Sequence, residues 1–61
     1  MWQIRCRLPD KTWRVLESPD RNDLDAAWDE WTRDYAGLPL YAALYFDGRY
    51  VGCRSRHFAG F

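Results

Sequence analysis

Long apolar runs are absent from this 61-residue sequence, and cysteine, histidine and methionine are scarce. No segment reaches the roughly 18 consecutive apolar residues of a membrane-spanning helix, and the first five residues lack the basic-then-apolar layout of a signal peptide. Two cysteines are too few for a disulfide framework, although a single bridge between them stays open. We therefore expect a cytoplasmic protein, without a membrane span, whose thiols are free.

Side chains that carry catalysis or hold metal ions are also few. The single histidine, His57, follows Cys53 at a spacing that would supply half of a zinc site, but the second pair of ligands is missing, since Cys6 is the only other soft ligand. The sequence has no glycine-rich phosphate loop and no G-x-S-x-G motif. It predicts a non-enzymatic protein with no catalytic site, metal site or cofactor.

What the sequence does contain suits one small domain spanning residues 1–61. A chain of this length buries only about 60% of the surface of its unfolded form, so its core must be thin. Aromatic residues make up 18% of the chain and fill such a core economically. Nine basic and nine acidic side chains give a formal net charge of zero, which argues against a simple polybasic nucleic-acid binder.

Alternation of apolar and polar residues predicts two strands before the middle of the chain. The inward phase of the first strand comprises Trp2, Ile4, Cys6 and Leu8. After a turn that begins at Pro9, residues 12–17 are predicted to return as the second strand. In that strand we expect Trp13 and Val15 to point inward and Arg14 to point outward.

A single amphipathic helix is predicted over residues 20–36. Its apolar side chains recur at helical spacing within about 100° of arc; they are Leu24, Ala27, Trp28, Trp31, Tyr35 and Leu38. Ser18, Asp20 and Asn22 are alternative N-caps. Gly37 is expected to end the helix.

Two further strands are predicted at residues 40–46 and 49–56, because Asp47-Gly48 between them is a strong two-residue hairpin signal. On the inward face such a loop pairs Phe46 with Arg49, Leu44 with Val51, and Ala42 with Cys53. Both Cys6 and Cys53 are therefore expected to be buried.

The resulting fold class is α+β, with the order β-β-α-β-β and a four-stranded antiparallel sheet packed on one amphipathic helix. The strand orders 2-1-3-4 and 1-2-4-3 are both compatible with antiparallel neighbours. Because one helix covers only one face of a sheet, the other face is expected to be exposed.

Charge is divided unevenly between the helix and the rest of the chain. Residues 20–36 carry two arginines against six carboxylates, a net of −4, and the remainder carries seven basic against three acidic side chains, a net of +4. The carboxylates are Asp20, Asp23, Asp25, Asp29, Glu30 and Asp34. We interpret them as a partner-binding face that imitates a nucleic-acid backbone and occupies a basic groove on another protein; the alternative is an ordinary solvated helix face.

The exposed sheet face is the alternative binding surface. It is expected to carry Gln3, Arg5, Arg7, Arg14, Tyr41, Tyr45, Tyr50, Arg54 and Arg56. Tyrosine and arginine are enriched at binding hot spots, and rings interleaved with cations suit the stacking of single-stranded bases. Ala43 and Gly52 between the tyrosines predict a shallow depression. The alternative is a plain sheet surface with arginine stems lying over the rings.

In size, stand-alone β-β-α-β-β layout and acidic helix row, the chain resembles the small phage-encoded inhibitor proteins, the anti-CRISPR proteins especially. The resemblance covers the whole architecture and no sequence motif, so no functional residue is carried over from it. It implies a protein that binds a CRISPR effector subunit stoichiometrically and blocks its access to DNA. The expected partner is therefore a larger bacterial nucleic-acid-binding protein. A nucleic-acid-binding module and a small structural or dimerising protein are the alternatives.

Overall fold

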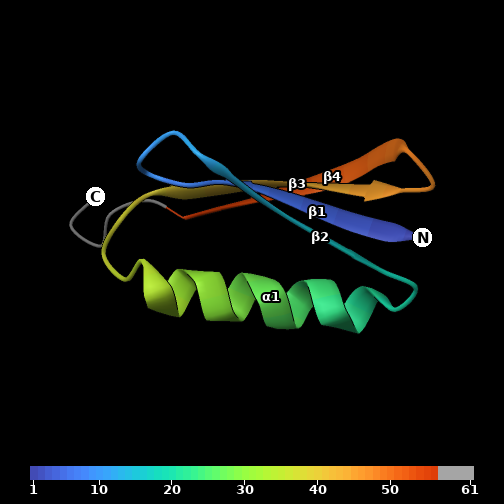
Figure 1. Cartoon of the computed structure of the whole chain (residues 1–61), viewed down its shortest axis with the longest axis horizontal. Coiled ribbons are helices and arrows are strands. Elements are labelled where there is room, and N and C mark those ends of the chain that lie inside the picture. The colour runs from blue at the N-terminus through green and yellow to red at the C-terminus, as the bar shows by residue number, and fades with distance from the viewer. Residues whose placement is uncertain (57–61) are drawn as a thin grey trace.

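Four strands and one helix form in the order that the periodicity predicts, in a computed structural model that describes residues 1–56 (Figure 1). The elements are β1 (Trp2–Arg7), β2 (Trp13–Ser18), α1 (Arg21–Asp34), β3 (Leu40–Phe46) and β4 (Arg49–Arg56). All neighbouring strands are antiparallel. The predicted α+β fold, a four-stranded antiparallel sheet with one helix, is confirmed.

The sheet has the strand order β2-β1-β3-β4, which is one of the two orders that the sequence allowed. The first and third strands therefore lie in the centre, and β2 and β4 form the two edges. Figure 1 shows α1 running along one face of the sheet. Within residues 1–56 no element covers the opposite face, which we call the open face.

Of the three candidate caps, Asp20 begins the helix. Its side chain accepts a hydrogen bond from the N–H of Asn22 at 2.9 Å, which satisfies a helix donor that has no partner within the helix. Ser18 has a different role: it is buried, and its hydroxyl donates to Asp23 at 2.5 Å. At the other end Tyr35 is the C-cap, and Gly37 at φ +80° turns the chain toward β3.

The core lies between α1 and the central strands. Its buried members are Ile4, Cys6, Leu8, Leu24, Ala27, Trp31, Leu40, Ala42 and Leu44. Trp28 and Tyr35 pack against this cluster while only partly buried, and Leu38 lies outside it with 39% of its surface exposed. The predicted helix stripe is thus confirmed in its middle and ends before Leu38.

The predicted inward phase of β2 is wrong. Trp13 and Val15 are each 55% exposed on the open face, and Arg14 lies on the helix side. The β1–β2 hairpin has a three-residue loop, closed by a hydrogen bond from the Leu8 N–H to the Thr12 carbonyl at 2.9 Å, with Lys11 at φ +72°. This loop pairs Arg7 with Trp13, so both side chains take the same outward face.

The predicted register of β4 holds next to the hairpin loop and then fails. Phe46 pairs with Arg49, as expected, but the register shifts between Leu44 and Tyr45 and leaves Val51 without a partner. Beyond this β-bulge, Leu44 pairs with Gly52. A one-residue shift exchanges the two faces of a strand. It carries Cys53 to the open face and turns Arg54 and Arg56 toward the helix.

We predict that Trp31→Ala lowers the free energy of unfolding by about 3–5 kcal/mol, because truncating a buried tryptophan leaves a cavity. Trp31 is only 7% exposed. Trp13→Ala on the open face is the matched control and should cost far less, near the usual ~0.5 kcal/mol of surface substitutions. Urea unfolding followed by circular dichroism measures both. Equal losses for the two variants would contradict the assignment of the core face.

Candidate functional site

Most of the predicted partner-binding carboxylates on α1 already have partners inside the molecule. Asp20 caps the helix and Asp23 accepts the Ser18 hydroxyl. Asp25 forms an ion pair with Arg54, and Asp34 lies 3.9 Å from a guanidinium nitrogen of Arg14. Within residues 1–56, only the carboxylates of Asp29 and Glu30 lack such a partner, so two of the six are wholly available to another molecule.

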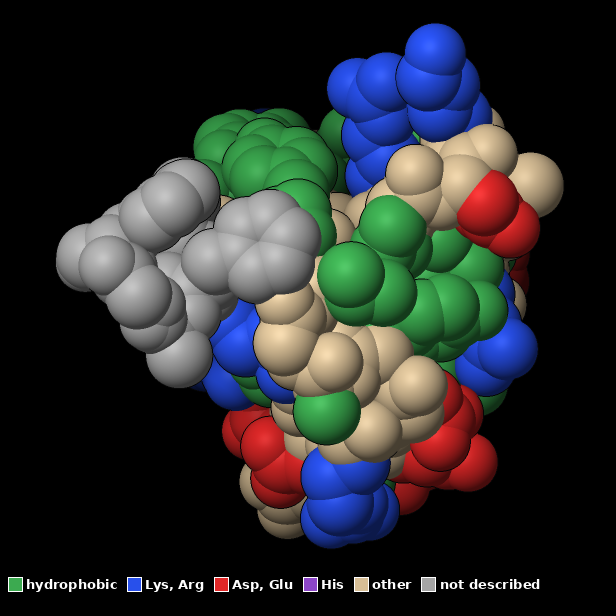
Figure 2. All heavy atoms as spheres, turned by 90° about the vertical axis from the view of Figure 1, so that its left-hand side faces the viewer, with side chains coloured by type: hydrophobic (Ala, Val, Ile, Leu, Met, Phe, Trp, Pro, Cys, Tyr) green, Lys and Arg blue, Asp and Glu red, His purple; other side chains and the backbone are tan. Residues whose placement is uncertain are grey.

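The carboxylates form two rows along the helix. Asp25 and Asp29 are one turn apart on the side of β4, since Asp25 contacts Arg54. Asp23, Glu30 and Asp34 lie on the side of β2. Figure 2 looks at the end of the molecule where α1 ends, and it shows acidic side chains on both flanks of the helix layer with basic atoms between them. The two-row arrangement expected from the helical spacing is therefore present.

Three of the arginines predicted for the open face lie on the helix side instead: Arg14, Arg54 and Arg56. The guanidinium of Arg56 donates hydrogen bonds to the carbonyls of Thr32, Tyr35 and Leu38. Carbonyls in the last turn of a helix have no partner within the helix, and a cation there also opposes the negative end of the helix dipole. These arginines join strands to the helix and are unavailable on the open face.

The open face is a grid of three rows that cross the sheet from β2 to β4. The first row is Trp13, Arg7, Tyr41 and Ser55. The second row is Val15, Arg5, Ala43 and Cys53. The third row is Glu17, Gln3, Tyr45 and Tyr50. Of the predicted sheet-face set, Arg5, Arg7, Gln3 and the three tyrosines are thus placed together as expected.

A line of polar contacts holds the third row and part of the second. The Arg5 Nε donates to the Gln3 side-chain oxygen at 2.7 Å, and the Gln3 side-chain nitrogen donates to Glu17 at 3.0 Å. The Arg5 guanidinium also lies 4.5 Å from the centre of the Tyr45 ring, a cation–π contact. Arg7 has no ion pair or side-chain hydrogen bond within the described residues, so it is the arginine of this face most accessible to a ligand.

Large rings stand exposed on the open face. Trp13 is 55% exposed, Tyr50 53% and Tyr41 43%, and Tyr45 contacts Tyr50 edge to face at 5.9 Å between ring centres. The small side chain of Ala43 lies between the tyrosines. Gly52, which was expected beside it, lies on the helix side because of the bulge, and Cys53 takes its place. This combination of rings and a guanidinium can bind another surface by burial, stacking and hydrogen bonding.

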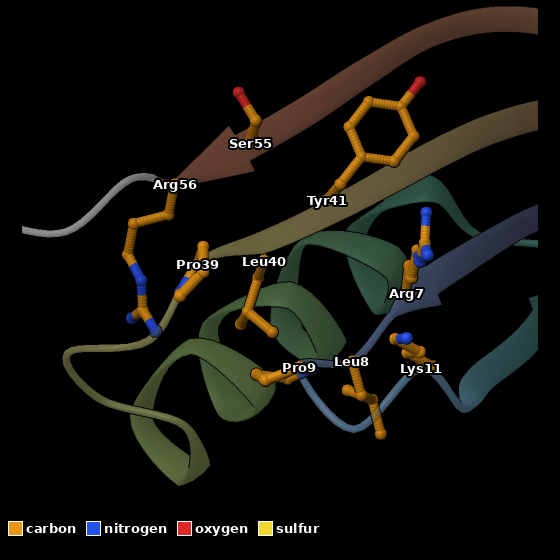
Figure 3. Close-up of a pocket in the computed structure, with 9 residues that line it drawn as sticks. All are labelled: Arg7, Leu8, Pro9, Lys11, Pro39, Leu40, Tyr41, Ser55 and Arg56. Carbon is orange, nitrogen blue, oxygen red and sulfur yellow. The ribbon is translucent and has the colours of Figure 1, made fainter.

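A hollow of about 370 Å³ adjoins the first row at the end of the sheet (Figure 3). It is lined by Arg7, Leu8, Pro9, Lys11, Pro39, Leu40, Tyr41, Ser55 and Arg56. Figure 3 shows Tyr41 and Ser55 rising from their strands on the open face, with Leu8 and Pro9 on the opposite side of the hollow. A partner on the open face would reach the cationic rim formed by Arg7 and Lys11.

Metal ligands do not gather in the part of the chain that the structure describes: no group of three or more His, Cys, Asp or Glu side chains there could hold an ion. His57, the candidate partner of Cys53 in half a zinc site, lies outside the described residues. None of the helical segments among residues 1–56 has the length and apolar character needed to cross a membrane.

Sequence reasoning missed Trp13, Val15 and Cys53 as members of the open face. Two signals would have placed them. A three-residue loop after Leu8 makes Arg7 pair with Trp13 and Arg5 pair with Val15. Because paired side chains share a face, Trp13 and Val15 lie on the same face as the two arginines. Glycine inside a strand often marks a bulge, and Gly52 adjoins the unpaired Val51.

We predict that the two cysteines differ sharply in reactivity. Both are free, Cys53 is exposed, and Cys6 is buried; burial raises the pKa of the Cys6 thiol and so removes its reactive thiolate. Brief treatment of the folded protein with iodoacetamide at pH 8 should add one label, which intact mass detects, and Cys53→Ser should remove it. Equal labelling of both cysteines would contradict the exposure of Cys53 alone.

We predict that one tyrosine of the open face titrates late. The hydrogen bond with the Cys53 side chain, followed by desolvation and the negative charge of the Cys53 thiolate, raises the pKa of Tyr50 to about 12 from its ordinary value of 10.0. The folded state then holds the phenol proton more tightly than the unfolded state, so the free energy of unfolding should fall as pH rises between these values. Ultraviolet titration of tyrosinate tests this: Tyr50→Phe should remove the last step and Tyr45→Phe should leave it.

Comparisons with known proteins found no match to this chain among protein-family models, curated proteins or solved structures.

Proposed function

We propose that this chain is a small non-enzymatic binding protein of the bacterial cytoplasm that docks the open face of its sheet on a larger protein. The observation that supports this most is the exposure of Trp13, Tyr41 and Tyr50 beside Arg7 on a face that no described element covers. Tryptophan, tyrosine and arginine dominate binding hot spots. Several large apolar side chains exposed on one face are typical of an interaction site.

A protein partner fits this face better than a nucleic acid does. Of the five arginines expected there, only Arg5 and Arg7 lie on it, and Arg5 is held by Gln3 and Tyr45. Glu17 places a carboxylate in the same surface. Nucleic-acid affinity depends mainly on the number of phosphates that cations neutralise. The open face therefore supplies rings for a protein interface with too few free cations for a phosphate backbone.

Docking through the acidic helix is the second candidate, and Asp29 and Glu30 favour it because their carboxylates have no partner within residues 1–56. The other four carboxylates have partners within the fold, so a mimic of a nucleic-acid backbone would have to be built largely from groups that already bind hydrogen-bond donors or arginines of the same chain. The open face, whose rings are exposed, is therefore the stronger candidate for docking.

The inhibitor function implied by the resemblance to phage-encoded proteins agrees with this mode of action. A binding domain can block a target only by covering a surface that the target needs. A CRISPR effector subunit whose nucleic-acid-binding region is covered by the open face would lose access to DNA. Binding would then be stoichiometric, and the charge of the acidic helix would repel incoming nucleic acid.

We predict that two paired substitutions separate the candidate surfaces. The sheet pair Arg7→Glu/Tyr41→Ala should weaken binding to a captured target by at least about tenfold, because hot-spot truncations cost about 2 kcal/mol or more. The helix pair Asp29→Lys/Glu30→Lys should change it much less. The target is first identified by photo-crosslinking from a bacterial lysate with a benzophenone amino acid at position 50, and affinities are then measured by surface plasmon resonance.

Controls for this experiment guard against unfolding and against the nucleic-acid alternative. Both variants are first melted beside the unsubstituted protein, and only folded variants are compared. If the helix pair abolishes binding while the sheet pair retains it, the open face is not the docking surface. A labelled single strand that shifts at low salt, and is released by moderate salt, would instead establish nucleic-acid binding.

A further inference from the structure

The outer edge of β2 presents three main-chain positions that bond to nothing in the described residues. The Leu8–Thr12 hydrogen bond fixes the alternation of the β1–β2 ladder, so the N–H and C=O groups of residues 14, 16 and 18 point toward β1. Those of Trp13, Val15 and Glu17 point the other way. Their side chains share the open face, and their main-chain groups form an unpaired edge.

This edge lacks several of the features by which proteins protect exposed strands, although Arg14 and Glu17 give it two charged side chains. Natural edges are interrupted by bulges, proline or lysine, or are covered. The other edge strand, β4, has a bulge at Val51. In contrast, β2 pairs with β1 without a register shift over Trp13–Ser18, and it contains neither proline nor lysine. The β2 edge is thus a regular template for another strand.

We infer that β2 pairs with β2 of a second copy of this chain, antiparallel and about a two-fold axis at Val15. The outward positions are self-complementary in this register: Val15 faces Val15 of the partner subunit, and Trp13 faces Glu17 of the partner subunit. Three pairs with two hydrogen bonds each satisfy every outward group of Trp13, Val15 and Glu17. The two four-stranded sheets become one continuous sheet.

Side chains beside the axis also fit a second copy. Trp13 and Val15, each 55% exposed, gain apolar neighbours on the open side, and a chain of zero net charge meets no overall repulsion. On the helix side, however, Asp23, Glu30 and Asp34 of each copy approach those of the other, offset only by Arg14. Salt screens this repulsion, so the dimer should tighten as ionic strength rises.

The dimer and the proposed function share Trp13 and otherwise involve different parts of the open face. Pairing at the β2 edge leaves Tyr41, Tyr45 and Tyr50 uncovered near the far edge, so a docking partner can still bind there, now in two copies. A chain that stays monomeric would leave the docking proposal standing, and a failed docking experiment would leave the dimer standing. Because edge pairing buries less than a standard interface of about 1,600 Å², we expect a dissociation constant in roughly the micromolar range.

The test is the mass of the protein in solution, measured by sedimentation velocity from low to high micromolar concentration. The unsubstituted chain should shift from one copy to two. Val15→Pro removes only an outward N–H, which edge strands tolerate, and should raise the dissociation constant at least tenfold. The matched control Val15→Ala keeps the N–H and should still dimerise. Increasing sodium chloride from 50 to 500 mM should lower the dissociation constant of the unsubstituted protein.

A second measurement keeps the inference testable if Val15→Pro fails to fold. In the unsubstituted protein, amide hydrogen exchange at Trp13, Val15 and Glu17 should slow as concentration rises, while exchange at Tyr50 should not. A chain that stays monomeric at high micromolar concentration overturns the inference. So does a dimer in which these three amides exchange as fast as in the monomer, because it must form through another surface.

Discussion

Within residues 1–56, one helix of 14 residues supplies the second layer, and the placement of the large side chains there follows from that constraint. The apolar stripe of α1 can cover only part of one sheet face, so the core is restricted to a small cluster around Ile4, Cys6 and Leu24, which are almost fully buried. Salt bridges and hydrogen bonds extend the contact to the margins, where Arg54 and Arg56 reach the helix from β4. No element among residues 1–56 covers the opposite face.

The sequence predicts the element order, the inward phase of β1, the helix stripe and the start of the β3–β4 hairpin, because in each of these a single local signal dominates. It misplaces β2 because apolar residues occupy both of its phases: Trp13 and Val15 on one, Leu16 on the other. The length of the loop before β2 then decides which of these two sets of side chains points toward the core. The sequence misplaces the end of β4 because the bulge shifts the register by one residue, and the only local sign of the bulge is Gly52 beside the unpaired Val51.

The candidate site was predictable in part for the same reason. Arg5, Arg7, Tyr41 and Tyr45 lie on central strands whose phase is set by burial, and they were placed correctly on the open face. The charged helix row was also located correctly, but sequence alone does not reveal that four of its six carboxylates have partners within the fold. Two of these carboxylates pair with arginines of the strands and two accept hydrogen bonds from uncharged groups, so most of the row serves the fold. The aromatic side chains of the open face remain exposed.

The account rests on the claim that the sheet has one covered and one bare face, with the bulge deciding which side chains of β4 lie on each. Nuclear magnetic resonance with a soluble paramagnetic probe tests this most directly, because relaxation enhancement reports the distance of each proton from solvent. The account predicts strong enhancement at the ring protons of Tyr41 and Tyr50 and weak enhancement at the Trp31 indole. Protection of both tyrosine rings in the monomeric protein would contradict it.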